Sequence, residues 1–272
     1  MKHGFALATC LAAILAVAGC AGGPKEGPRT SPAGSAREEA MRFFENRTKE
    51  IRTVHAALEL RWLSPELPKA LSCRGSLVFQ APDQLRLRGT SKAFFTIFDL
   101  VAGPEKIAID VPREKVLIRG ERTDPDWSRF AFDPELVSIA LLAHPFPAQD
   151  GSLELQEKGP DFVWEGDGTW MLIDGGNGLP ARFRRDEPAT EITWEEWDVI
   201  DGIPWPRHIC LKWPEEGGVL EIEFAGVHLK KPIRPGYFSK EPEADREVLT
   251  PGEGIERWAE MAERESEELS GE

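Results

Sequence analysis

Residues that could do chemistry are sparse in this sequence. An enzyme needs a nucleophile with a base, paired carboxylates in a cleft, or metal ligands. The five histidines show no metal-type spacing such as H-x-x-x-H, and there is no G-x-S-x-G, phosphate-loop or dinucleotide motif. His208 and Cys210 are two residues apart on one predicted strand, but a zinc site needs more ligands than this pair. The sequence therefore predicts no enzyme, no metal site and no cofactor.

An acidic cluster beside Trp194 and Trp197 comes nearest to a catalytic pattern, because paired carboxylates flanked by tryptophans could indicate a glycosidase. The cluster consists of Glu191, Glu195, Glu196 and Asp198. On a β-strand, however, Glu195 and Trp197 share one face while Trp194 and Glu196 share the other. Alternating acidic residues are typical of the outer face of a sheet, so the cluster is predicted to be structural.

A modification site is predicted near the N-terminus, where the chain reads Val17-Ala18-Gly19-Cys20. A basic start, a short apolar stretch over residues 5–18 and small residues before the cut are typical of a secretory signal. The stretch is too short to span a bilayer comfortably. The cysteine after the small residues resembles the lipobox of bacterial lipoproteins, which implies that Cys20 is acylated and becomes the first mature residue. The alternative is an ordinary secreted protein with an incidental cysteine.

The overall composition limits the classes of molecule that this protein can bind. The chain has 272 residues, a net charge of −14 and a pI near 5.0. This charge argues against binding nucleic acid, and against docking on anionic lipid through basic patches. Nine tryptophans and fourteen phenylalanines accompany a single tyrosine, which indicates a large apolar surface. That surface is either a filled core or the wall of a ligand cavity.

Two cysteines remain once Cys10 is lost with the signal and Cys20 carries lipid. Cys73 and Cys210 both lie in strand-like segments and in an oxidising compartment, so a disulfide between them is one alternative. Two cysteines alone do not establish a bridge, and two independent buried thiols are the expected outcome.

The chain divides into four segments. Residues 1–19 are predicted to be the signal peptide, and residues 20–35 to form a flexible Gly/Pro/Ser-rich tether. Residues 36–240 are predicted to form the folded domain. Residues 241–272 form an acidic tail in which residues 251–268 could be helical.

The folded domain begins with a predicted helix from Ser35 to Ile51, with Ser35 as its cap and a one-sided apolar stripe. After it the apolar period changes to two, and about 11–13 short strands follow in an antiparallel meander. One of these strands is predicted to begin at Phe94. A second helix, Pro134–Ala143, is apolar nearly all round, which is typical of a helix buried on every side.

Several short sequence motifs in the predicted strands resemble those of the periplasmic lipoprotein carriers and receptors of the Lol system, the LolA/LolB-like superfamily. Residues 74–86 read Arg-Gly-Ser-Leu-Val-Phe-Gln-Ala-Pro-Asp-Gln-Leu-Arg, a glycine and an alternating strand followed by a proline turn and an apolar-Arg pair. The later words Leu-Pro-Ala-Arg-Phe at 179–183, Asp-Gly-Ile-Pro-Trp-Pro at 201–206 and Gly-Tyr-Phe at 236–238 are similar to the family in their order. The resemblance covers residues 36–240.

The resemblance implies a fold: an incomplete antiparallel β-barrel wrapped around an apolar cavity, with helices covering its open side. The family's soluble carrier lacks a lipid anchor and its receptor has one, so the lipobox favours the receptor side. By the resemblance, the carrier's gating arginine is matched to Arg86. An exposed apolar loop tip, which the receptor has, is not identified in the sequence.

The function predicted from these observations is a lipid-anchored, non-catalytic carrier or receptor that binds acyl chains of lipids or lipoproteins in the half-barrel. It would face the periplasm from the bacterial outer membrane, the location favoured by Ala21 after Cys20, and a periplasmic carrier protein is a possible partner. The alternative is an envelope sensor or assembly factor that uses the same fold to bind a protein. Alternation selects as cavity-lining candidates Leu58, Leu60, Trp62, Leu77, Phe79, Leu85, Leu87, Phe98, Leu136 and Ile139.

Overall fold

The structure is a computed structural model. It describes residues 33–257 except 64–69, 92, 131–133, 145–153, 167, 188 and 215–216. The predicted signal peptide, Cys20, most of the predicted tether and the tail beyond residue 257 lie outside the described residues. Residues 33–35, predicted to be part of the tether, are helical instead, because the first helix begins at Ala33 rather than at a cap on Ser35.

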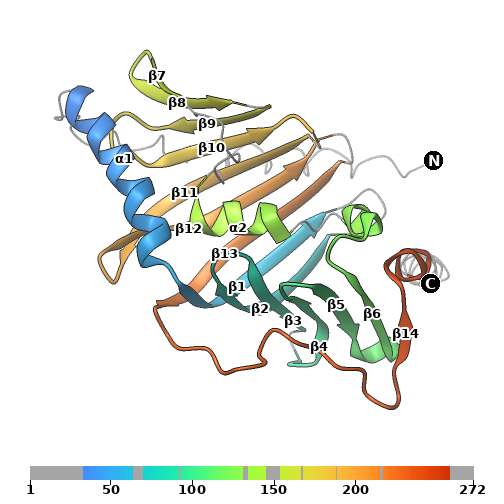
Figure 1. Ribbon diagram of the computed structural model, residues 1–272. Coiled ribbons are helices and arrows are strands. Elements are labelled where there is room, and N and C mark those ends of the chain that lie inside the picture. The colour runs from blue at the N-terminus through green and yellow to red at the C-terminus, as the bar shows by residue number, and fades with distance from the viewer. Residues whose placement is uncertain are drawn as a thin grey trace, which may run out of the picture.

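The described strands form one 14-stranded sheet that is not closed on itself (Figure 1). The strand order is β14-β6-β5-β4-β3-β2-β1-β13-β12-β11-β10-β9-β8-β7, and every pair is antiparallel except β14 with β6. Two meanders, β1–β6 and β7–β13, therefore meet where β1 pairs with β13. This open, strongly curved sheet confirms the predicted incomplete barrel.

The strand bounds follow the predicted meander closely. The first meander contains β1 (Thr53–Leu63), β2 (Leu71–Gln80), β3 (Gln84–Thr90), β4 (Thr96–Ala102), β5 (Lys106–Val111) and β6 (Val116–Glu121). The second contains β7 (Glu154–Lys158), β8 (Asp161–Gly166), β9 (Thr169–Ile173), β10 (Pro180–Arg185), β11 (Thr190–Ile200), β12 (Ile203–Trp213) and β13 (Gly218–Leu229). Two short 3-10 helices, η1 (Pro112–Glu114) and η2 (Pro125–Phe130), flank β6.

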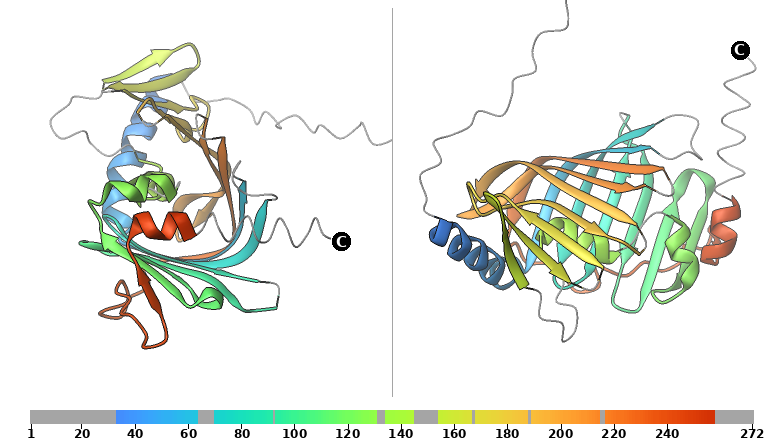
Figure 2. Two further views of the ribbon diagram at one scale, coloured as in Figure 1. Left: turned by 90° about the vertical axis from the view of Figure 1, so that its right-hand side faces the viewer. Right: turned by 90° about the horizontal axis from the view of Figure 1, so that it is seen from above.

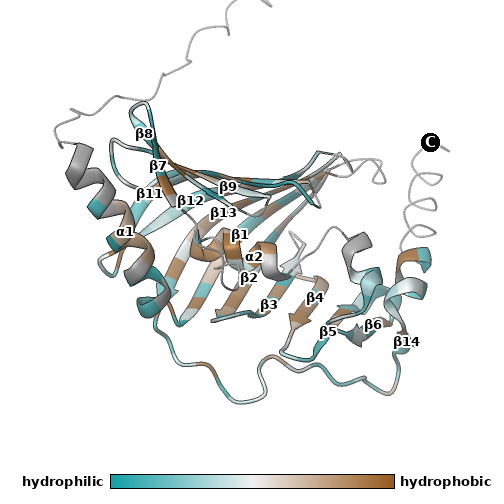
Figure 3. Cartoon of the chain, turned by 45° about the horizontal axis from the view of Figure 1, so that its top comes forward, coloured by the Kyte–Doolittle hydropathy of each residue, from teal (hydrophilic) through white to brown (hydrophobic). Residues whose placement is uncertain are grey.

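Two α-helices cover the concave side of the sheet (Figures 1 and 2). Helix α1 (Ala33–Glu50) buries Ala40, Phe44 and, just past its end, Ile51 at helical spacing. In helix α2 (Pro134–Leu142) every residue from Leu136 to Leu142 is buried, as its nearly continuous apolar sequence predicts. Figure 3 shows this helix, whose residues are largely apolar, beside strands of the sheet that also carry apolar residues.

The strand register puts the predicted apolar residues on one face. Leu58 on β1 lies opposite Gly75 on β2, and Leu77 on β2 lies opposite Leu87 on β3. A Cβ at Gly75 would lie 2.7 Å from the end of the Leu58 side chain, so the glycine leaves room for that side chain across the strand pair. The three leucines belong to a single apolar cluster that also contains residues of both helices.

A segment that follows β13 crosses the opposite, convex face of the first meander. We call residues 230–246 the strap. It bonds successively to β3, β4, β5 and β6, and it ends in β14 (Glu247–Leu249), which pairs in parallel with the edge of β6. Strand β14 was not predicted, because its three residues lie in a segment of acidic and polar character.

Of two further local predictions, one was wrong and one was confirmed. Strand β4 begins at Thr96, so Phe94 lies in the turn before it rather than in the strand. Cys73 and Cys210 are buried free cysteines, the expected outcome. Cys73 lies on β2 and Cys210 on β12, and strands β1 and β13 lie between these two strands. The two cysteines are therefore three strand spacings of ~4.8 Å apart. A disulfide needs its Cα atoms within about 7 Å.

Candidate functional site

The predicted cavity-lining residues gather on the concave side, under the two helices. Eight of them are buried there, namely Leu58, Leu60, Leu77, Phe79, Leu85, Leu87, Leu136 and Ile139. Trp62 is half-buried at the end of β1, and Phe98 is half-buried with its ring over Gly89 of the neighbouring strand. In this conformation the eight buried residues pack against other side chains of the apolar core. Their role in ligand binding stays a prediction.

Helix α2 is held in place by two side chains from other elements. The indole of Trp194 on β11 donates a 2.7 Å hydrogen bond to the carbonyl of Ala140. The guanidinium of Arg47 on α1 donates to the carbonyls of Leu141, at 3.0 Å, and of Leu142. These carbonyls belong to the last turn of α2, where carbonyls lack partners within the helix and a positive charge is favourable.

Arg47 is a buried cation without a carboxylate partner in the described part of the chain. Its side chain is 2% exposed, and it also donates to the carbonyl of Pro204 at the start of β12. Its guanidinium lies 5.1–5.6 Å from the ring centroids of Phe43, Trp197 and Trp205, within range of cation–π attraction. Burial lowers the pKa of Arg47 from its ordinary value to about 9, which still leaves the group protonated at neutral pH.

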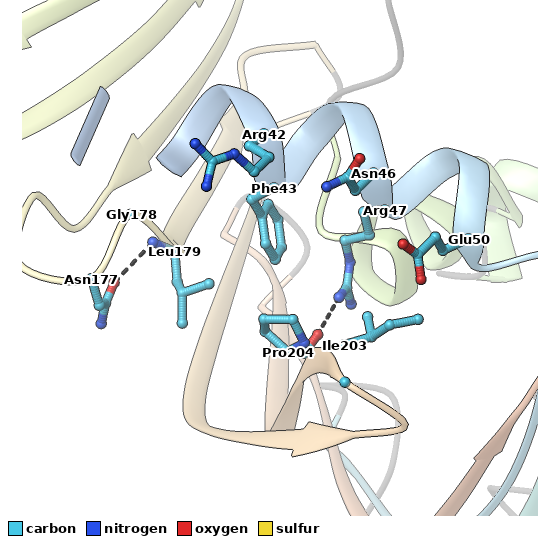
Figure 4. A pocket seen from close by; sticks show the side chains of 11 residues that line it. Arg42, Phe43, Asn46, Arg47, Glu50, Asn177, Gly178, Leu179, Ile203 and Pro204 are labelled. Atoms are coloured by element: carbon cyan, nitrogen blue, oxygen red, sulfur yellow. Dashed lines mark hydrogen bonds between the residues drawn. The ribbon is translucent and has the colours of Figure 1, made fainter. Parts of the chain in front are cut away.

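Arg47 also lines a pocket of about 280 Å³ between α1 and two turns of the sheet (Figure 4). One wall comes from α1, with Arg42, Phe43, Asn46 and Glu50 beside Arg47. The other wall comes from two turns, residues 177–179 between β9 and β10 and residues 202–204 between β11 and β12. None of the predicted cavity-lining residues lines this pocket, which brings together three segments that are distant in sequence.

The acidic cluster of β11 has the surface character that was predicted, but one facial assignment was wrong. Trp194 bonds to α2, and the ring of Trp197 packs edge-on against Phe43 of α1 at 5.8 Å, so both indoles contact the helices. Glu196 has a left-handed φ of 54°, and this kink breaks the alternation between them. On the opposite face, the Glu195 carboxylate lies 3.3 Å from the Nδ1 atom of His208.

No group of three or more metal-ligating residues occurs within the described residues. Burial raises the pKa of both free thiols, Cys73 and Cys210, so neither is poised as a thiolate nucleophile. Among the described helices, none has the length and apolarity needed to cross a membrane.

Arg86, the predicted gating residue, lies on the convex face. Its guanidinium donates two hydrogen bonds to the carboxylate of Asp99 on β4, at 2.9 Å from Nε and 2.6 Å from Nη2. It also donates a hydrogen bond to the carbonyl of Tyr237 in the strap. Burial alone would raise the pKa of Asp99, but hydrogen bonds from Arg86 and Arg88 hold it below its ordinary value. The gating role of Arg86 stays a prediction; the contacts shown attach the strap.

A second buried carboxylate completes this network on the convex face. Asp110 of β5 lies directly opposite Asp99, and two like charges so close would repel. Lys240 of the strap lies 2.8 Å from Asp110 and 3.7 Å from Asp99, and Arg246 lies 3.0 Å from Asp110. The strap therefore supplies the cations that two buried aspartates require.

An apolar tip, which the sequence analysis did not identify, lies between β3 and β4. Phe94 and Phe95 are 80% and 73% exposed, the largest exposed fractions among the large apolar side chains described. The amides of Phe94 and Phe95 both donate to Ser91, and Phe94 has a left-handed φ of 66°. Two adjacent aromatic residues break the strict alternation of a strand, and this was the sequence signal that could have indicated an exposed turn.

Arg47 was missed for a related reason. It lies three residues after Phe44 and four before Ile51, so it occupies a position in the apolar stripe of α1. A charged residue on such a stripe indicates a buried polar contact. Its partners, however, lie 94 to 157 positions away in sequence, and no spacing reveals them.

Comparison with known proteins establishes the fold. No protein-family model matches the sequence, and no curated protein matches it. Among solved structures, a LolA superfamily protein from Nitrosomonas europaea is 12% identical and superposes with a TM-score of 0.50, covering 77% of this chain and 98% of that chain. This chain has the LolA-type fold. A DUF1329 family protein from Desulfovibrio piger, 11% identical, gives a TM-score of 0.49 over 77% of this chain and 98% of that chain. A putative outer membrane lipoprotein-sorting protein domain from Vibrio parahaemolyticus, also 11% identical, gives a TM-score of 0.47 over 76% of this chain and 97% of that chain.

Proposed function

We propose that this protein is a lipid-anchored, non-catalytic carrier or receptor that binds acyl chains of lipids or lipoproteins on the concave side of its open barrel. The observation that carries the proposal is the apolar helix α2, which is buried on the concave side of an unclosed sheet and joined at its end to Arg47 of α1. The LolA-type fold supports it. Each methylene that moves from water to this side contributes about 0.8 kcal/mol, so binding needs no catalytic group.

In this proposal, the conformation described is the one in which α2 covers the apolar face of the sheet. An acyl chain would replace α2 against the apolar face of the sheet, and the exchange is inexpensive because one apolar surface substitutes for another. The hydrogen bonds of α2 to Arg47 and Trp194 are the polar contacts that must break. A carrier protein of the periplasm is the proposed donor of the chain.

The decisive measurement is native mass spectrometry of the mature chain with Cys20→Ser, purified without added lipid. We expect co-purified acyl-chain adducts and saturable uptake of a fluorescent fatty acid. A chain that carries no adduct and takes up no fatty acid would contradict the proposal without the use of any further variant.

Two variants on strand β1 test on which face of the sheet the ligand binds. Leu60→Glu puts a carboxylate on the concave face, where burying a charge costs several kcal/mol, so fatty-acid uptake should fall while the far-UV spectrum persists. Ala57→Glu is the matched control, because Ala57 lies exposed on the opposite face of β1. Equal uptake by the two folded variants would move the ligand away from the concave side.

The proposed anchor is the thioether-linked lipid of Cys20. Only a thiol receives this lipid, so Cys20→Ser expressed with its leader should take up no labelled fatty acid covalently. Cys10→Ser in the same leader is the control and should be labelled normally. Covalent labelling of the Cys20→Ser protein would contradict the anchor and, with it, the proposed location at the outer membrane.

The exposed tip of Phe94 and Phe95 supports the receptor side of the proposal. Two rings held in a tight turn can enter the interface of the membrane to which the anchor ties the domain. Replacing both with Ser should reduce the binding of unlipidated protein to lipid vesicles. Val248→Ser, which removes an exposed apolar side chain elsewhere, should not.

One observation favours a second function. The concave residues are buried against one another in this conformation, as in a protein whose interior is filled by its own side chains. An envelope sensor or assembly factor would use the fold in this way and bind a protein with its outer faces. Absence of lipid adducts together with an unchanged α2 would favour this function.

A further inference from the structure

We propose that the pocket between α1 and the turns 177–179 and 202–204 binds the anionic headgroup, a carboxylate or phosphate, of an amphiphile whose chain occupies the concave side. This inference rests on the proposed function and names the chemical class of its ligand. It places one end of the ligand at a site that is separate from the apolar residues discussed above.

The charge of the pocket is opposite to that of the chain. Two arginines, Arg42 and Arg47, line it in a protein of net charge −14. Glu50 also lines the pocket, but its carboxylate is engaged by Lys230 at 3.2 Å. Within the described residues neither arginine forms an ion pair, so the two cations remain available to an anion.

Arg47 has donors to spare for such an anion. A guanidinium carries five N–H groups, and its three hydrogen bonds to carbonyls use each nitrogen once. A buried charge that has no opposite charge beside it is costly, and an anion at this position would offset that cost. The planar fork of Arg suits the two oxygens of a carboxylate or phosphate.

The remaining walls fit a headgroup and its first methylenes. Arg42 and Asn46 are exposed at the rim, while Phe43, Leu179 and Pro204 supply apolar surface (Figure 4). At about 280 Å³ the pocket is at the lower end of the range for small-molecule sites, too small for a whole acyl chain.

The pocket also adjoins the mouth of the concave side. The same guanidinium reaches the pocket and the last carbonyls of α2, so a headgroup beside Arg47 would direct its chain towards the space under that helix. An anion that draws Arg47 away from these carbonyls would also weaken the attachment of α2.

The test compares ligands of one chain length, dodecyl phosphate, dodecanoate and dodecan-1-ol, with inorganic phosphate alone. Calorimetry on the mature chain with Cys20→Ser should show both anionic amphiphiles binding about tenfold more tightly than the alcohol. Arg42→Gln should remove most of this preference and leave the affinity for the alcohol unchanged. Arg113→Gln, which removes an exposed arginine far from the pocket, should leave the preference intact.

The outcomes separate this inference from the proposed function. If all three amphiphiles fail to bind, the proposed function falls, and this inference falls with it. If the alcohol binds as tightly as the anions, or Arg42→Gln keeps the preference, the headgroup site is wrong while the carrier function stands. If inorganic phosphate binds as tightly as dodecyl phosphate and depends on Arg42, the pocket is a site for free anions and the amphiphile is excluded.

Discussion

The two faces of the sheet are held by opposite kinds of interaction. On the concave face, α1 and α2 pack on apolar strands, and the buried cation Arg47 bonds only to carbonyls. On the convex face of the first meander, the strap is attached through two buried aspartates, Asp99 and Asp110, and the cations around them. One sheet therefore has one face held chiefly by apolar burial and one held by charge.

The difference teaches which face can move. Apolar contacts have no fixed direction, so a ligand of the right polarity can replace α2 with little loss. Removing one member of a buried ion pair leaves the other charge unpaired, so the strap has no inexpensive open state. We expect the concave side to respond to apolar ligands and the convex side to respond to acid.

The largest expected effect is on the concave core. Phe79→Ala removes a ring that is fully buried beneath the helices and should lower the free energy of unfolding by about 3–5 kcal/mol. Phe95→Ala is the matched control and should change it by less than about 0.5 kcal/mol, because that ring is exposed. Urea unfolding measures both. Similar losses in the two variants would show that the core is not where stability resides.

The next effect is on the convex network. Asp99→Asn leaves Arg86 without its buried anion and should cost about 3 kcal/mol of unfolding free energy. Glu221→Gln, which breaks an exposed pair with Arg61, should cost no more than about 1 kcal/mol. A loss in Asp99→Asn as small as that in Glu221→Gln would contradict the claim that charge holds this face.

Acid should separate the two faces. The pKa of Asp99 is lower in the folded protein than its ordinary value of 3.8, so its contribution to stability is present above that value and is lost as pH falls through the folded pKa. Unfolding free energy should therefore drop below about pH 4, by less in Asp99→Asn than in the parent. Limited proteolysis should show cleavage in the strap before cleavage in α2. The reverse order would contradict the comparison.

The smallest expected effect concerns the attachment of α2. Trp194→Phe removes the hydrogen bond to Ala140 and should cost about 1 kcal/mol, with faster hydrogen exchange confined to α2. Trp127→Phe removes a similar bond, to the carbonyl of Glu121, and should cost as much without affecting α2. Faster uptake of a fluorescent fatty acid only in Trp194→Phe would sharpen the assignment of α2 as the mobile element.

Much of the fold could be predicted because it depends on local periodicity. Alternation placed Leu58, Leu77 and Leu85 on the correct face, and the all-round apolar sequence of α2 predicted its burial. Strand β14 was not predicted, because its pairing with β6 rather than its own polar sequence makes it a strand. Phe94 and Trp197 were misplaced where a left-handed residue interrupts the alternation, since no period describes such a kink.

The sequence by itself determined the character of the protein: a mostly antiparallel β-sheet with one apolar face, two helices to cover it, and Cys20 as the predicted anchor site. These features follow from residue type and short-range spacing, and both are printed in the chain. The tertiary structure alone decided where charge is used. Arg47 meets Pro204 from 157 positions away, and Lys240 meets Asp99 and Asp110 across two strands. Such contacts depend on how the whole sheet curves, because only the curvature brings α1 to the turns and the strap to the buried aspartates.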